Sequence, residues 1–377
     1  MQKNSDIEAL RGYAIAITFV AHLDGLFITW KPALSTFWLG GGVDLFFSIS
    51  GFLITAGLMR SIDSRTRFSV YAPKFWLRRI FRIWPAAIFW STCYMIVAIV
   101  FIRSEDRNYQ SIILNNWFYS LINVQNFYIY YCVNFETLTC KPTAIWHYWS
   151  LSLEEQFYIF IPILILITPN RRILILPLLA LAIWQSCTIR PWGQLLWFIR
   201  TDALLYGVAV ALTIHFYAEK INILRSAVPR RAWQALLGTA IVALIAVSQP
   251  SIMPHYMGLV AIVAGSIVFL AAGNQNLLTC RSSFRSFAEY IGSRSYSLYL
   301  VHMPVIALVR HFLIEDGLIL SEGQRFDQIL GLLFVIAISL GLSEFSYQII
   351  ENPLRRYGRM LSEKWPATAA KVLSSNM

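Results

Sequence analysis

Residues 37–59 read FWLGGGVDLFFSISGFLITAGLM, an apolar run in which Asp44 is the single charged residue. A helix needs about 20 predominantly apolar residues to cross the roughly 30 Å hydrocarbon layer of a bilayer, and this run is long enough. It therefore predicts a membrane-spanning helix.

The composition of the whole chain leads to the same class. Of its 377 residues 57% are hydrophobic and only 14% are charged, and the mean hydropathy is +0.56. Soluble domains carry about 25% charged residues. The net charge of +11 does not indicate nucleic acid as a partner, because the Lys and Arg residues lie between apolar runs and form no basic stripe. We predict an all-α integral membrane protein.

About ten apolar runs have the character of membrane spans. They cover residues 8–29, 37–59, 83–103, 147–168, 173–189, 195–215, 233–249, 255–273, 294–313 and 327–349. If the N-terminus is cytoplasmic, most of the 31 Lys and Arg residues fall in inner segments. The positive-inside rule then predicts that both termini are cytoplasmic.

The longest outer loop, about 104–146, contains Cys132 and Cys140. An oxidising compartment would allow a disulfide between them, and two unpaired thiols are the alternative. The other cysteines have no metal-ligand spacing, so we predict no metal site.

Ionisable side chains within apolar spans are costly, and they usually face a cavity and serve a function. At about 1.5 Å per residue, four of them lie roughly 10 Å inside their spans: His22, Asp44, Glu154 and Asp202. Imidazole is well suited to proton transfer near neutral pH. The alternative is that these groups pair with one another and only hold the bundle together.

Arg78, Arg79 and Arg82 open the third predicted span, at the opposite face of the membrane. Guanidinium groups bind phosphate in a bidentate manner. The cluster therefore predicts a site for an anionic cytoplasmic ligand, although anchoring by the positive-inside rule would also explain it.

Several motifs in order resemble the acyltransferase 3 family of membrane-bound enzymes, which O-acetylate cell-surface glycans. They are IEALRGYAIAITFVAHLDG, GGGVDLFFSISGFLIT, RRIFRIWP, HYWSLSLEEQFY, SYSLYLVHMP and the closing ENP, and together they span about residues 5–358. Many members carry an SGNH-type esterase domain after the membrane part. This chain has none before Met377, so we expect a membrane domain at 1–358 and a basic tail at 359–377. Any activity outside the membrane would then come from the membrane domain or from a periplasmic partner protein. The resemblance also implies a location in the bacterial inner membrane.

The resemblance implies transfer of an acetyl group from acetyl-CoA, a co-substrate rather than a bound cofactor, to a lipid-linked or nascent polysaccharide. It implies that His22 accepts the acetyl group or acts as general base, oriented by Asp44 or Glu154. Arg79 and Arg82 would dock the phosphates of the donor.

The remaining expected site residues lie on either side of this centre. Arg11 and His302 are expected on the donor side, and Trp149, Tyr158 and Asp202 on the acceptor side, with Trp146 as a further aromatic candidate. Snorkelling of Arg11 and a hydrogen bond from His302 to a neighbouring helix are the alternatives. For the aromatic residues an interfacial belt is an equally good explanation. A transporter or flippase of a glycolipid or anion, and a non-catalytic membrane scaffold, remain alternative functions.

Overall fold

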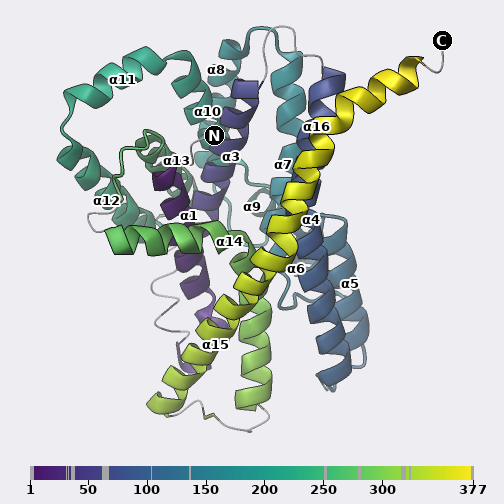
Figure 1. Ribbon diagram of the computed structural model, residues 1–377. Coiled ribbons are helices and arrows are strands. Elements are labelled where there is room, and N and C mark those ends of the chain that lie inside the picture. The colour runs from purple at the N-terminus through teal and green to yellow at the C-terminus, as the bar shows by residue number, and fades with distance from the viewer. Residues whose placement is uncertain are drawn as a thin grey trace.

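The computed structural model describes residues 4–30, 32, 34, 39–61, 68–102, 104–135, 137–249, 253–278, 282–315, 320–321 and 324–374. Within these ranges the regular structure is entirely helical and includes no strand, which confirms the predicted all-α class. Figure 1 shows a bundle of helices along which the C-terminal helices run obliquely.

The α-helices differ greatly in length. They are α1 (Ser5–Ala21), α3 (Gly41–Ser61), α4 (Phe68–Phe101), α5 (Tyr109–Leu121), α6 (Gln125–Asn134), α7 (Tyr148–Ile167), α8 (Ile175–Ser186), α9 (Leu195–Phe198), α10 (Asp202–Phe216), α11 (Ala218–Ala227), α12 (Arg230–Val247), α13 (Tyr256–Ala271), α14 (Ser282–Val309), α15 (Arg325–Phe345) and α16 (Asn352–Ser374). Short 3-10 turns occupy Leu23–Gly25, Ile28–Trp30 and Arg171–Leu174, and π-helical turns occupy Arg310–Glu315 and Ser346–Glu351.

Six helices of the described part are long and apolar enough to cross a membrane. They are Gly41–Ser61, Tyr71–Phe101, Tyr148–Ile167, Arg230–Val247, Phe284–Glu315 and Arg325–Lys364. The pair α10 and α11 gives a seventh if it counts as one span bent by 93°. Three of the ten predicted spans correspond to shorter helices, namely α1 with 17 residues, α8 with 12 and α13 with 16. The number ten and the cytoplasmic termini stay predictions.

Helix α4 begins well before the span predicted at 83–103. Its 34 residues correspond to about 50 Å of helix. Pro85 lies inside the helix and does not mark its start. The arginine cluster therefore lies within α4 rather than at its opening.

Glycines bring two pairs of helices into backbone contact. A Cβ atom at Gly292 of α14 would collide with the carbonyl oxygen of Glu8 on α1, and one at Gly207 of α10 with the carbonyl oxygen of Ser48 on α3. Small residues permit this close approach in membrane bundles. The two contacts set the position of α1 against α14 and of α3 against α10, which carry most of the candidate site.

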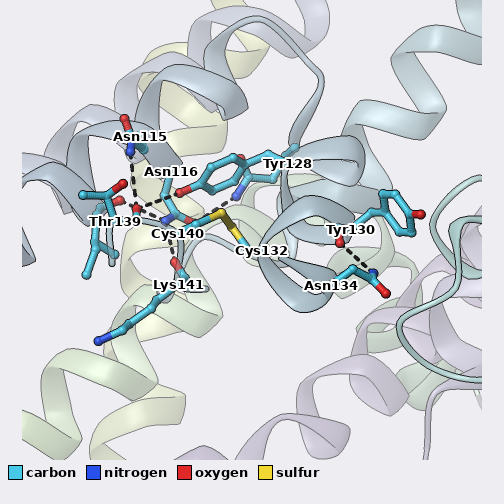
Figure 2. Close-up of a disulfide and its surroundings, with 11 residues drawn as sticks. Asn115, Asn116, Tyr128, Tyr130, Cys132, Asn134, Thr139, Cys140 and Lys141 are labelled. Atoms are coloured by element: carbon cyan, nitrogen blue, oxygen red, sulfur yellow. Dashed lines mark hydrogen bonds between the residues drawn. A yellow bond between two sulfur atoms is a disulfide. The ribbon is translucent and has the colours of Figure 1, made fainter. Parts of the chain in front are cut away.

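The predicted outer loop at 104–146 contains the helices α5 and α6. Cys132 of α6 forms a disulfide with Cys140, which confirms the paired alternative (Figure 2). The side-chain amide of Asn116 donates a hydrogen bond to the carbonyl oxygen of Lys141 at 2.8 Å. The segment after the disulfide is thereby fastened to α5.

Candidate functional site

A cavity of about 80 Å³ lies among α1, α3, α4, α7 and α14. Its charged lining residues are Arg11, Arg79, Arg82 and Glu154. The structure thus brings three of the four residues expected to bind the donor to one cavity. A space of this size has room for several water molecules or one thin chain.

Two members of the arginine cluster line the cavity and one does not. Arg78 is exposed, and its Nε donates to the carbonyl oxygen of Lys74 at 3.1 Å. The guanidinium of Arg79 lies over the rings of Phe75 and Tyr158, 5.5 Å and 5.2 Å from their centroids.

No ion pair joins Arg79 or Arg82 to a carboxylate among the described residues. Two like charges three residues apart on one helix repel each other. An anion bound between them would relieve this repulsion and would meet donors suited to phosphate.

Glu154 lies on the wall of this cavity and not beside His22. Its carboxylate accepts hydrogen bonds from the hydroxyl groups of Ser50 and Tyr158. Tyr158, which was expected to bind the acceptor, therefore shares the cavity with the arginines.

Two hydroxyl groups, those of Ser150 and Tyr299, also belong to the lining of the cavity. The Ser150 Oγ and Tyr299 Oη atoms lie 2.6 Å apart, and the Tyr299 hydroxyl donates to the carbonyl oxygen of His147 at 2.7 Å. The helices α7 and α14 are joined at this point. We refer to Ser150 and Tyr299 as the hydroxyl wall.

Three imidazoles gather around the hydroxyl wall. His22 Nδ1 lies 3.1 Å from His302 Nε2, and the ring centroids of His302 and His147 are 5.0 Å apart. His302 and His147 each place a ring nitrogen against the carbonyl oxygen of Tyr299, at 2.7 Å and 3.0 Å. His302 is buried and does not line the cavity. Its contact with His22 agrees with the alternative of a hydrogen bond to a neighbouring helix, and its donor role stays a prediction.

These contacts assign the tautomers of neutral His302 and His22. A carbonyl oxygen only accepts, so His302 Nδ1, which faces Tyr299, carries the proton. The other nitrogen, Nε2, then accepts from His22 Nδ1. The lone pair of His22 is consequently on its Nε2 atom, where it can accept a proton or attack a carbonyl carbon.

His22 lies at the end of its helix and not within a continuous span. Helix α1 ends at Ala21, and His22 is its C-cap residue, followed by a 3-10 turn. The predicted depth of His22, about 10 Å inside a helix over 8–29, assumed a continuous α-helix. It does not hold, because the segment after residue 21 is not α-helical. His22 remains partly exposed.

Asp44 pairs with an arginine that the sequence analysis did not select. Nε and Nη2 of Arg200 each donate to one oxygen of the Asp44 carboxylate at 3.2 Å. The same guanidinium lies against two adjacent rings, those of Trp149 and Trp197, 4.6 Å and 4.5 Å from their centroids. Neither Asp44 nor Glu154 has a hydrogen bond to His22 within the described ranges.

Asp202 forms a second buried ion pair. Its Oδ2 accepts from Nη2 of Arg190 at 2.5 Å, and both side chains are 1% exposed. Asp202 and Asp44 each lie in the first turn of a helix, where the helix dipole stabilises a carboxylate. The sequence analysis missed Arg190 and Arg200, although a charge between apolar runs was the available signal.

The family model for an acyltransferase domain matches residues 4–344 of the chain. The peptidoglycan O-acetyltransferase OatA of Listeria monocytogenes is 27% identical over an alignment 378 residues long. The alignment covers 93% of this chain and 56% of that protein. The O-acetyltransferase OatA of Staphylococcus aureus is 26% identical and is covered to 57%. The chain thus spans about half the length of the curated relatives it matches. No solved structure matches it.

Proposed function

Because the chain belongs to the acyltransferase 3 family, we propose that it moves an acyl group, acetyl in the first instance, from cytoplasmic acyl-CoA to a hydroxyl group of a cell-surface or lipid-linked polysaccharide. The main support is the cavity whose lining includes Arg11, Arg79 and Arg82 together with the hydroxyl wall. Tyr299 of that wall contacts His302, which in turn contacts His22. The peptidoglycan named for the Listeria relative makes a cell-wall glycan the first acceptor to test.

The donor occupies the cavity in this proposal. Arg79 and Arg82 bind its phosphate groups, because their guanidinium groups carry full charge and have no carboxylate partner among the described residues. The pantetheine arm then extends toward Ser150 and Tyr299. Glu154 holds the Tyr158 ring against Arg79 through the bond between carboxylate and phenol.

His22 supplies the base for acyl transfer. Its Nε2 takes the proton of the acceptor hydroxyl, the new C–O ester bond forms at the acyl carbon, and the C–S bond of the thioester breaks. The departing thiolate takes up a proton as the coenzyme is released. His302 serves as the positioning residue, since its contact with His22 Nδ1 keeps Nε2 free.

Tyr299 lines the donor cavity, whereas His22 does not, and the two residues are connected through His302. In this proposal the acyl end of the donor therefore passes Tyr299, which is held by its bonds to Ser150 and His147. We propose a rotation of the Tyr299 side chain that opens the wall when the acyl end of the donor arrives.

The function is tested in cells and with purified protein. Surface glycan from cells with and without the gene is compared by mass spectrometry, and the gene should account for an added acetyl group. His22→Ala and His22→Gln should both abolish this acetylation. Full acetylation in both variants would remove His22 from the mechanism.

The donor site has a matched control in the same cluster. Arg79→Ala combined with Arg82→Ala should weaken acetyl-CoA binding by at least tenfold in calorimetric titration, whereas Arg78→Ala should leave it unchanged because Arg78 points away from the cavity. Equal affinity in all three proteins would leave membrane anchoring as the role of the cluster.

A further inference from the structure

The loop of residues 187–194, between α8 and α9, presents a tryptophan beside the histidines. Trp192 is 51% exposed, although its neighbour Arg190 is buried. Irregular backbone exposed to lipid does not occur within the hydrocarbon layer, so an exposed residue of this loop faces water or the membrane interface.

Two contacts hold this loop in one conformation. Arg190 binds Asp202 at the base of α10. On the other side of Trp192, the side-chain amide of Asn134 donates to the carbonyl oxygen of Gly193 at 2.6 Å, and Gly193 has a φ of +90° that favours glycine. Asn134 ends α6, close to the disulfide (Figure 2). A buried ion pair is costly to desolvate, and here its consequence is a fixed position for Trp192.

A continuous series of rings connects Trp192 with His22. The His22 and Trp146 ring centroids are 6.0 Å apart, and so are those of Trp146 and Trp192. Trp192 also contacts the buried Trp197 at 4.4 Å. The ring planes of Trp146 and Trp192 are perpendicular, so the two side chains form a corner beside the imidazole.

We propose that Trp146 and Trp192 are the binding surface for a pyranose ring of the acceptor glycan. The C–H face of a pyranose is apolar and flat and packs on an aromatic ring, while its hydroxyl groups stay solvated at the rim. A rigid tryptophan loses little conformational entropy when it binds. The corner holds the sugar so that one hydroxyl group reaches His22.

This proposal deepens the proposed function, and it replaces Trp149, Tyr158 and Asp202 as the acceptor site. Trp149 and Asp202 are buried in contact with arginines, and Tyr158 faces the donor cavity. Of the aromatic residues considered from the sequence, only Trp146 has its ring in direct contact with that of His22 among the described residues.

The test measures saccharide binding separately from catalysis. The purified full chain is titrated with chitotetraose, a β-1,4-linked N-acetylglucosamine oligomer, in wild-type, Trp192→Ala, Trp192→Phe and Trp184→Ala forms. Trp184 is the matched control, because it is 56% exposed on α8 and lies in no ring contact among the described residues. Trp192→Ala should weaken binding at least tenfold, Trp192→Phe by less, and Trp184→Ala not at all.

The possible outcomes separate the two proposals. Equal affinity in wild-type and Trp192→Ala protein, or no binding by wild-type protein, overturns the tryptophan corner. Acetyl transfer from acetyl-CoA to the same oligomer is measured in parallel. Binding that depends on Trp192 without any transfer supports the corner and contradicts the proposed function, whereas transfer with unchanged affinity in Trp192→Ala does the reverse.

Discussion

The bond between Asp44 and Arg200 allows a structural role for Asp44 to be separated from a catalytic one. The Asp44→Asn substitution keeps the size of the side chain and replaces one acceptor oxygen with an NH₂ group. That group faces a guanidinium nitrogen that now donates to carboxylate oxygen at 3.2 Å. Arg200 is 3% exposed, so water cannot solvate the charge that loses its partner.

The size of the effect follows from this burial. Removing one partner of a buried ion pair costs about 3–5 kcal/mol, because the remaining charge stays desolvated. The two adjacent tryptophan rings that contact Arg200 continue to stabilise the cation after the substitution, so we expect about 3 kcal/mol, the lower end of this range. Arg200→Met in the same protein removes the unpaired charge and should recover about 2 kcal/mol of the loss.

The assay is equilibrium unfolding in mixed micelles, followed by tryptophan fluorescence, for the wild type, both single variants and the double variant. The acetylation of surface glycan is measured in parallel. We expect Asp44→Asn to lose activity and the double variant to regain part of it, because Asp44 has no hydrogen bond to His22. A stable but inactive double variant would refute this reasoning and return Asp44 to the catalytic group. A coupling energy near zero would refute the stability argument.

Three further predictions concern separate parts of the molecule. His302→Ala should lower the rate of transfer about 100-fold or more, as loss of an orienting group does. Acetyl-CoA affinity measured by titration should stay within about twofold, because His302 does not line the cavity. Weaker donor binding would instead support its expected donor role. Gly207→Ala should destabilise the protein by about 1–3 kcal/mol in the same unfolding assay, since its Cβ would strike the carbonyl oxygen of Ser48, and Gly57→Ala, with open space around it, is the control. Cys132→Ser should cost about 2–3 kcal/mol, because the disulfide closes a loop with a sequence separation of 8; hydrogen exchange of α6 measures this, and unchanged protection would contradict it.

Hydropathy alone was sufficient to predict the class and several of the helices. The run at 37–59 corresponds to α3 at Gly41–Ser61, and the run at 147–168 to α7 at Tyr148–Ile167. Both are helices with a high share of buried residues, and in both the apolar run ends where the helix ends. Helix α4 was predicted too short, because its first residues are too polar to belong to the apolar run at 83–103, although they continue the same helix, which contains Pro73 and Pro85.

The partners of the charged residues could not be predicted from depth along a helix. Asp44, Glu154 and His22 were expected to meet at one level, but the direction of each side chain depends on how its helix is rotated within the bundle. Asp44 faces α10 and the preceding Arg200, whereas Glu154 faces the cavity with Arg79. The contact between His22 and His302 depends on the packing of α1 on α14, which pattern and periodicity do not determine.

The hydroxyl wall has a consequence for the energy metabolism of the cell. A bacterial membrane stores a proton gradient, so a protein that served substrates on both of its faces through an open water-filled path would dissipate it. Ser150 and Tyr299 line the proposed donor cavity, and the backbone carbonyl of Tyr299 contacts His302. In the proposed transfer, these side chains would keep protons from passing between the donor and acceptor sides, and the displacement of one phenol ring would open the path.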